Sequence, residues 1–64
     1  MSWKPEFKVD GVWYDNAQRF ATEKEARESA LARYMVWTVP TDYRATESTD
    51  PVNYHVVDGR DTPL

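Results

Sequence analysis

Apolar and polar residues alternate on both sides of an Asp10-Gly11 pair near the start of the chain, a pattern typical of a β-hairpin. A two-residue Asp-Gly loop suits a type I′ turn, because that turn needs a positive φ at both central positions. In the predicted hairpin Lys8 and Trp13 share one face. The other face carries four apolar side chains, paired as Val9 with Val12 and Phe7 with Tyr14. A bend is expected at Asp15-Asn16, after which the strand resumes before a helix.

The helix is predicted from a capping pattern. Thr22 begins a Thr-x-x-Glu motif, in which the hydroxyl accepts from the third helical N–H and Glu25 reaches back to the N-cap N–H. The helix should therefore begin at Glu23. It should end near Trp37 or Thr38, because Pro40 disfavours a helical conformation in the residue before it.

The predicted helix is amphipathic. At 100° per residue, one narrow sector holds Ala26, Ala30, Tyr34 and Trp37, with Leu31 and Met35 beside it. The opposite side holds Glu25, Glu28 and Ser29. Since apolar residues at helical spacing usually form a core face, the apolar stripe is expected to pack on a sheet.

Two further strands are expected after the helix. Residues 42–48 have Tyr43 and Ala45 on one face, and Thr49-Asp50-Pro51 ends the run. Apolar and polar residues alternate again from Val52 to Val56, which predicts a second hairpin with residues 42–48. Residues 59–64 contain too little apolar surface to order themselves and are expected to form a flexible tail.

These elements predict one α+β domain over residues 1–58. Its order is β-β-α-β-β, and a small antiparallel sheet packs one face on the single helix and exposes the other. A chain of 64 residues allows only one domain. Because cysteine is absent and no segment has the pattern of a membrane span or a signal peptide, we expect a cytoplasmic protein with no membrane partner.

Nothing in the chain predicts an active site. The single histidine, His55, lies in a strand-like run, with no second His or Cys to hold a metal or activate a nucleophile. The two glycines follow aspartates in turns and form no phosphate-binding loop. We therefore expect no catalytic residue, no cofactor and no metal, and we do not expect an enzyme.

The charge is unevenly distributed along the chain. Residues 1–44 carry seven basic and seven acidic groups, whereas residues 45–64 carry one arginine and four acids, for a net charge of −3. A nucleic-acid-binding domain usually has a basic patch or stripe, so this balance disfavours nucleic acid as a partner. The acidic segment from Glu47 to Asp61 is interpreted as a solvated region or as a contact surface for a basic protein.

Aromatic and charged side chains are the remaining functional candidates. Trp13 faces away from the apolar side of its hairpin, so it is either an exposed contact residue beside Lys8 or half-buried against Pro5 or the tail. A platform that stacks single-stranded nucleic acid would instead use Trp3, Lys8, Trp13 and Arg19. The full set of candidate interaction residues is Trp3, Lys8, Trp13, Arg19, Glu47, Asp50, Tyr54 and Asp58.

Three stretches resemble small uncharacterised proteins encoded by bacteriophages and prophages. They are VDGVWYDN at residues 9–16, RFATEKEA at 19–26 and ESTDPVNY at 47–54, and the likeness runs over most of residues 7–57. The resemblance implies a bacterial host cytoplasm, where small acidic proteins bind and modulate host proteins. The RFATEKEA stretch is also similar to the arm-type DNA-binding domains of phage integrases, but their helix follows three strands.

The leading hypothesis is a non-enzymatic protein-interaction module, a phage or prophage accessory protein. It would bind a host or phage protein through its open sheet face and its acidic carboxyl-terminal hairpin. The first alternative is a nucleic-acid-binding domain that uses an exposed aromatic and basic sheet face, and its affinity would fall steeply with salt. The second alternative is a structural protein that forms homodimers through edge strands or exposed aromatic residues.

Overall fold

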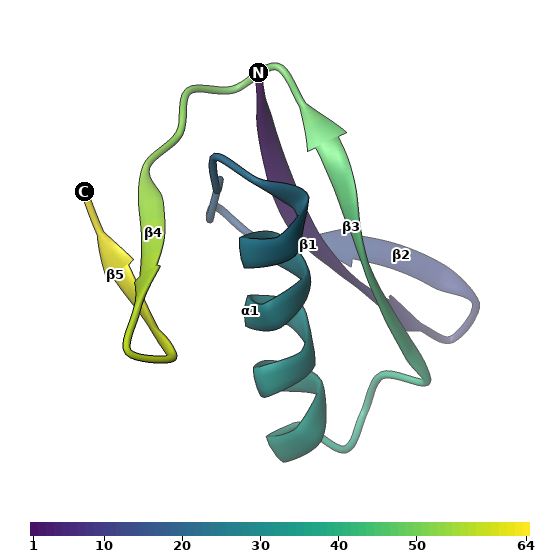
Figure 1. Ribbon diagram of the computed structural model, residues 1–64. Helices are drawn as coiled ribbons and strands as arrows, with labels where there is room; N and C mark the ends of the chain where they lie inside the picture. Colours follow the sequence, from purple (N-terminus) through teal and green to yellow (C-terminus); the bar gives the residue numbers. More distant parts are fainter.

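The computed structural model describes residues 1–64 and contains one helix and five strands. In chain order the elements are β1 (Ser2–Val9), β2 (Val12–Asp15), α1 (Glu23–Val36), β3 (Asp42–Ser48), β4 (Tyr54–Val57) and β5 (Arg60–Pro63). The strands form two antiparallel sheets, one of order β2-β1-β3 and one of order β4-β5. The helix lies between the two sheets, as Figure 1 shows. The predicted α+β class is confirmed.

The first hairpin has the predicted turn and the predicted register. Asp10 and Gly11 have φ values of 51° and 79°, as a type I′ turn requires. The pairs across β1 and β2 are Val9 with Val12, Lys8 with Trp13, Phe7 with Tyr14 and Glu6 with Asp15. Because side chains alternate along a strand, Lys8 and Trp13 lie on the face away from the helix.

The partner of β3 differs from the prediction. β3 has the expected bounds, but it pairs with β1 from Ser2 opposite Ser48 to Lys8 opposite Asp42. The predicted hairpin between residues 42–48 and 52–57 is therefore wrong. The long strand β1 offers a second edge when the chain returns from the helix, and pairing there places Tyr43 on the helix side opposite Phe7.

The carboxyl-terminal residues also differ from the prediction. Residues 60–63, expected to belong to a flexible tail, form β5 and pair with β4. Asp58 and Gly59 have φ values of 51° and 76°, so this hairpin repeats the type I′ turn of the first one. The backbone N–H of Leu64 donates to Asn53 O at 3.0 Å and holds the end of the chain beside the start of β4.

The helix begins at the predicted residue. Thr22 is the N-cap and its hydroxyl accepts from the Glu25 backbone N–H at 3.2 Å, while Arg27 pairs with Glu23 at 2.6 Å. The second bond of the predicted capping box is not made. Instead, the Glu25 carboxylate accepts from the Thr22 hydroxyl and from the backbone N–H of Val56 in β4. The cap therefore also joins the helix to the second sheet.

The helix face that enters the core is rotated from the predicted one. Ala26 and Ala30 are buried as expected, but Ser29 is buried as well, although it was placed on the polar side. The reason is that the second sheet covers that side of the helix. The Ser29 hydroxyl donates a 2.6 Å hydrogen bond to the carboxylate of Asp61 in β5. Met35, predicted beside the core stripe, is 76% exposed.

Phe20 is the centre of the core. Its side chain is fully buried, and its backbone exchanges two 2.8 Å hydrogen bonds with Trp3. The strand therefore resumes after the bend, but only as a single bridge to β1. The ring centroids of Phe20 and Tyr54 lie 6.1 Å apart, so Phe20 meets the first sheet through its backbone and the second sheet through its ring.

Candidate interaction surface

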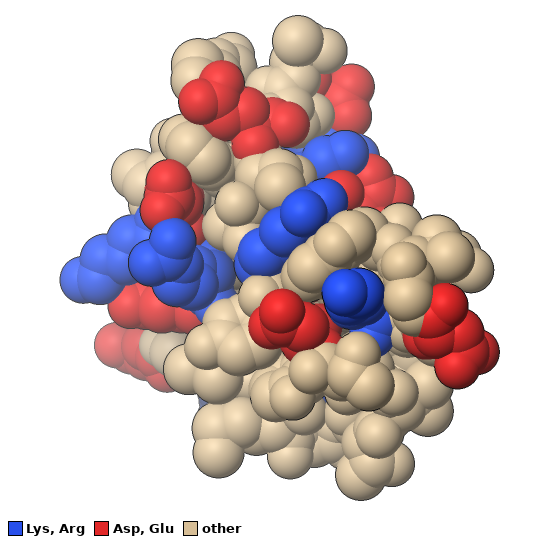
Figure 2. Space-filling model, turned by 90° about the vertical axis from the view of Figure 1, so that its right-hand side faces the viewer, with Lys and Arg blue, Asp and Glu red and all other residues tan.

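The face of the three-stranded sheet away from the helix carries charges of alternating sign. Six side chains form a continuous chain of ion pairs, which we call the ion-pair chain. In order, the contacts are Arg44–Glu6 at 2.7 Å, Glu6–Lys4 at 3.6 Å, Lys4–Asp15 at 3.0 Å, Asp15–Arg19 at 3.7 Å and Arg19–Asp50 at 2.9 Å. Figure 2 views the molecule from the side of β2 and β3, and positive and negative side chains are interspersed over its upper part.

The ion-pair chain neutralises itself. It contains three cations and three anions, and each has at least one partner of opposite sign. The hydrogen bond to Asp15 raises the pKa of Lys4, and the hydrogen bond from Arg19 lowers the pKa of Asp50. Because the positive and negative charges of these six side chains cancel, they create no positive potential. They therefore do not supply the electrostatic attraction on which nucleic-acid affinity depends.

Trp13 is covered by cations of its own chain. The Arg44 guanidinium carbon lies 4.0 Å from the Trp13 ring centroid, and the Lys8 ammonium lies 6.0 Å from it. Both distances are within the range of a cation–π contact. Trp13 is therefore half-buried, one of the two outcomes left open by its place in the hairpin, but it packs on Arg44 and not on Pro5 or the tail.

The four residues of the proposed stacking platform do not share a face. Trp3 pairs with Phe20, and strand alternation places it on the helix side of β1, opposite to Lys8. Arg19 belongs to the ion-pair chain, and its guanidinium also donates to the backbone oxygens of Gln18 and Asn16. The guanidinium donors of Arg19 are thus occupied by partners within the protein. Of the four proposed platform residues, only Lys8 and Trp13 lie together on one face.

The carboxyl-terminal acids do not form one surface. Asp50 pairs with Arg19, and Asp61 accepts from Ser29. Glu47 is exposed on β3, whereas Asp58 is exposed in the turn between β4 and β5. The remaining candidate, Tyr54, is half-buried against Phe20.

Large apolar side chains gather instead at the carboxyl end of the helix and in the residues that follow it. We call this region the apolar end. It holds four of the ten exposed large apolar residues of the protein, namely Met35, Val36, Trp37 and Val39. The carboxyl end of α1 lies at the bottom of Figure 1, and the lowest part of the face in Figure 2 carries almost no charge. The signal was present in the sequence, but Trp37 was assigned to the core stripe and Met35 was placed beside it.

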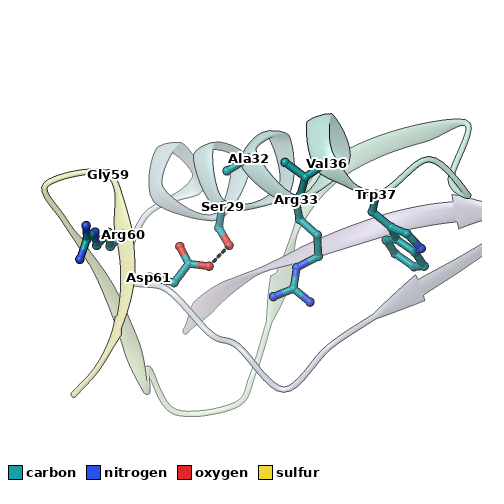
Figure 3. Close-up of a pocket in the computed structure, with 8 residues that line it drawn as sticks. All are labelled: Ser29, Ala32, Arg33, Val36, Trp37, Gly59, Arg60 and Asp61. Carbon is teal, nitrogen blue, oxygen red and sulfur yellow. Dashed lines mark hydrogen bonds between the residues drawn. The ribbon is translucent and has the colours of Figure 1, made fainter.

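A groove of about 680 Å³ opens beside the apolar end, between the helix and the turn of the second hairpin. Its lining residues are Ser29, Ala32, Arg33, Val36, Trp37, Gly59, Arg60 and Asp61. Figure 3 shows that the Arg33 and Trp37 side chains project from the helix on the same side, while Asp61 points to Ser29. The Trp37 ring meets Phe7 edge-on at 5.6 Å, which anchors one wall of the groove to the core.

Other features of the molecule add no further site. His55 pairs with Thr62 in the second sheet, and no three His, Asp or Glu side chains are grouped to hold a metal ion. The helix is too short and too polar to cross a membrane. The chain matches no family model, and no curated protein or solved structure shows significant similarity to it.

Proposed function

We propose that this domain is a non-enzymatic protein-interaction module that contacts its partner through the apolar end. The observation that carries the proposal is the outward position of Met35 and Val36, which are 76% and 82% exposed in the last turn of the helix. Large apolar groups gathered at one end of a small domain are typical of a surface that another protein covers.

The open sheet face is less suited to partner binding than the apolar end. The open sheet face, which the sequence favoured, uses its charges in the ion-pair chain, and its tryptophan packs under Arg44. Partner binding there would have to break contacts that the domain already makes. At the apolar end, burial removes apolar surface from water, and full burial of a fully exposed valine or methionine side chain is worth about 1.5–3 kcal/mol, so these partly exposed residues each contribute less than that range.

The partner is a host or phage protein if the resemblance to phage proteins holds, and that setting stays a prediction. The homodimer hypothesis competes for the same residues, because a second copy could also cover exposed apolar side chains. The nucleic-acid hypothesis has less support, since its proposed residues lie on two different faces.

A pull-down from bacterial lysate tests the proposal. The bait is the tagged protein, with and without nuclease, compared with a variant that carries Met35→Lys and Val36→Lys. Lysine suits the last turn of a helix, so the variant should keep its fold. The matched control is Leu64→Lys, because Leu64 is 72% exposed but lies at the far end of the second hairpin from the groove.

We expect a stoichiometric protein that survives nuclease, binds the wild type and the Leu64 variant, and is lost with the double variant. Recovery that disappears with nuclease would overturn the proposal in favour of nucleic acid. Equal recovery by all three baits would show that the apolar end is not the contact surface.

A further inference from the structure

Arg33 is a cation without a partner in its own chain. Of the eight basic side chains, five form ion pairs and three do not, namely Lys8, Arg33 and Arg60. Lys8 lies over Trp13. The exposed Arg33 side chain makes no hydrogen bond within the protein, so its guanidinium donors are free.

The surroundings of Arg33 combine a cation with apolar area. Arg33 projects from the same side of the helix as Trp37, which is 39% exposed, and Val36 also lines the groove. The one acid in the groove, Asp61, is held by the Ser29 hydroxyl at 2.6 Å and forms no ion pair with Arg33. The groove therefore offers an unused guanidinium next to an aromatic wall.

We propose that this groove binds an acidic segment of a partner protein. A carboxylate of the segment pairs with Arg33, and a neighbouring apolar side chain lies against Val36 and Trp37. This inference rests on the proposed function and names the chemistry of the partner. A guanidinium and a carboxylate form two parallel hydrogen bonds, and arginine and tryptophan are enriched among residues that dominate binding energy.

The charge of the protein favours a short acidic segment over a nucleic acid. The net charge is −3, and Asp58 and Asp61 lie in or beside the hairpin that forms one wall of the groove. A long polyanion would be repelled by these acids, whereas one carboxylate needs only Arg33. The volume of about 680 Å³ lies within the range of known ligand sites and accommodates a few residues.

Short capped peptides test this chemistry without knowledge of the partner. An acetylated, amidated pentapeptide of alternating glutamate and leucine is titrated into the ¹⁵N-labelled protein. Two reference peptides replace every glutamate by glutamine or every leucine by serine. We expect the glutamate-leucine peptide to shift the Arg33 side-chain and Trp37 indole resonances and to bind about tenfold more tightly than either reference.

Two matched variants locate the contact. With Arg33→Gln, the affinity for the glutamate-leucine peptide should fall to that for the glutamine-leucine peptide. Lys8→Gln is the control, because Lys8 also lacks an ion pair but lies over Trp13 on the sheet face away from the helix, outside the groove. That variant should bind the peptide as the wild type does.

Several results would overturn the inference. Equal affinity for all three peptides, or no shift at Arg33, would exclude carboxylate recognition there. Binding of an oligothymidylate at the same resonances would replace the acidic segment by a nucleic acid. A doubled mass in sedimentation that is lost with Met35→Lys and Val36→Lys would make a second copy the occupant. If the lysate partner still requires the apolar end while the peptides fail, only this inference falls and the interaction module stands.

Discussion

Arg19 and Asn53 exchange hydrogen bonds in both directions across 34 positions of the chain. The Arg19 backbone N–H donates to Asn53 Oδ1 at 2.8 Å, and the Arg19 carbonyl accepts from the backbone N–H of Asn53 at 3.0 Å. The same carbonyl accepts from the Tyr54 N–H at 3.1 Å. This contact fixes where β4 begins and so positions the second hairpin, which forms one wall of the groove.

Asn53→Ala should loosen the second sheet. The substitution removes the acceptor of the Arg19 N–H and the 2.9 Å bond from Asn53 Nδ2 to Ala17 O. Two such bonds contribute about 1–2 kcal/mol to the free energy of unfolding. Urea denaturation should show that loss, and amide exchange should accelerate most in β4 and β5. Unchanged exchange there would contradict the anchoring role.

The carboxyl of Asp50 should titrate below its ordinary pKa of 3.8, because Arg19 donates a hydrogen bond to its charged form. A folded-state pKa below the unfolded one stabilises the protein above the unfolded value, and this contribution is lost as the pH falls through the folded pKa. Carboxyl ¹³C shifts measured against pH report the value directly. In Arg19→Gln the pKa of Asp50 should rise toward 3.8, and no rise would show that Arg19 is not the cause.

Gly59→Ala should destabilise the second hairpin through its backbone alone. Gly59 has a φ of 76°, which disfavours side chains with a Cβ, but no atom lies within 4 Å of the position of that Cβ. The expected loss is about 1 kcal/mol. Gly11→Ala is the matched comparison, because Gly11 has a φ of 79° and equally open surroundings. If only the Gly11 variant lost stability in thermal denaturation, the second hairpin would not be part of the cooperative fold.

Phe20→Ala should remove more stability than any exposed aromatic substitution. Phe20 is fully buried between the sheets, and truncating a buried phenylalanine costs about 3–5 kcal/mol. A domain of this size has little more than that in total, so the amide spectrum of the variant should collapse toward that of an unfolded chain. Tyr14→Ala, at an exposed position on β2, should keep its dispersed spectrum. A well-folded Phe20→Ala protein would contradict this account of the core.

Local interactions determined the parts of the fold that the sequence predicted correctly. The turn at Asp10-Gly11, the cap at Thr22 and the bounds of β3 depend on residues that are close in the chain. Backbone sterics and short-range hydrogen bonds decide such features, so they can be derived before the tertiary fold is known. The same reasoning applies to the Asp58-Gly59 turn, whose signal was present, although the residues from Gly59 onward were expected to form a flexible tail.

Only the tertiary structure decided which strands pair and which side chains stay exposed. β3 pairs with β1, and residues 60–63 pair with β4 and are tied to the helix because Ser29, far away in the chain, donates a hydrogen bond to Asp61. The same packing covers the Ser29 side of the helix and leaves Met35 exposed. Alternation and helical period specify which residues share a face, but not which faces meet. The position of the interaction surface therefore follows from long-range packing between the helix and the two sheets.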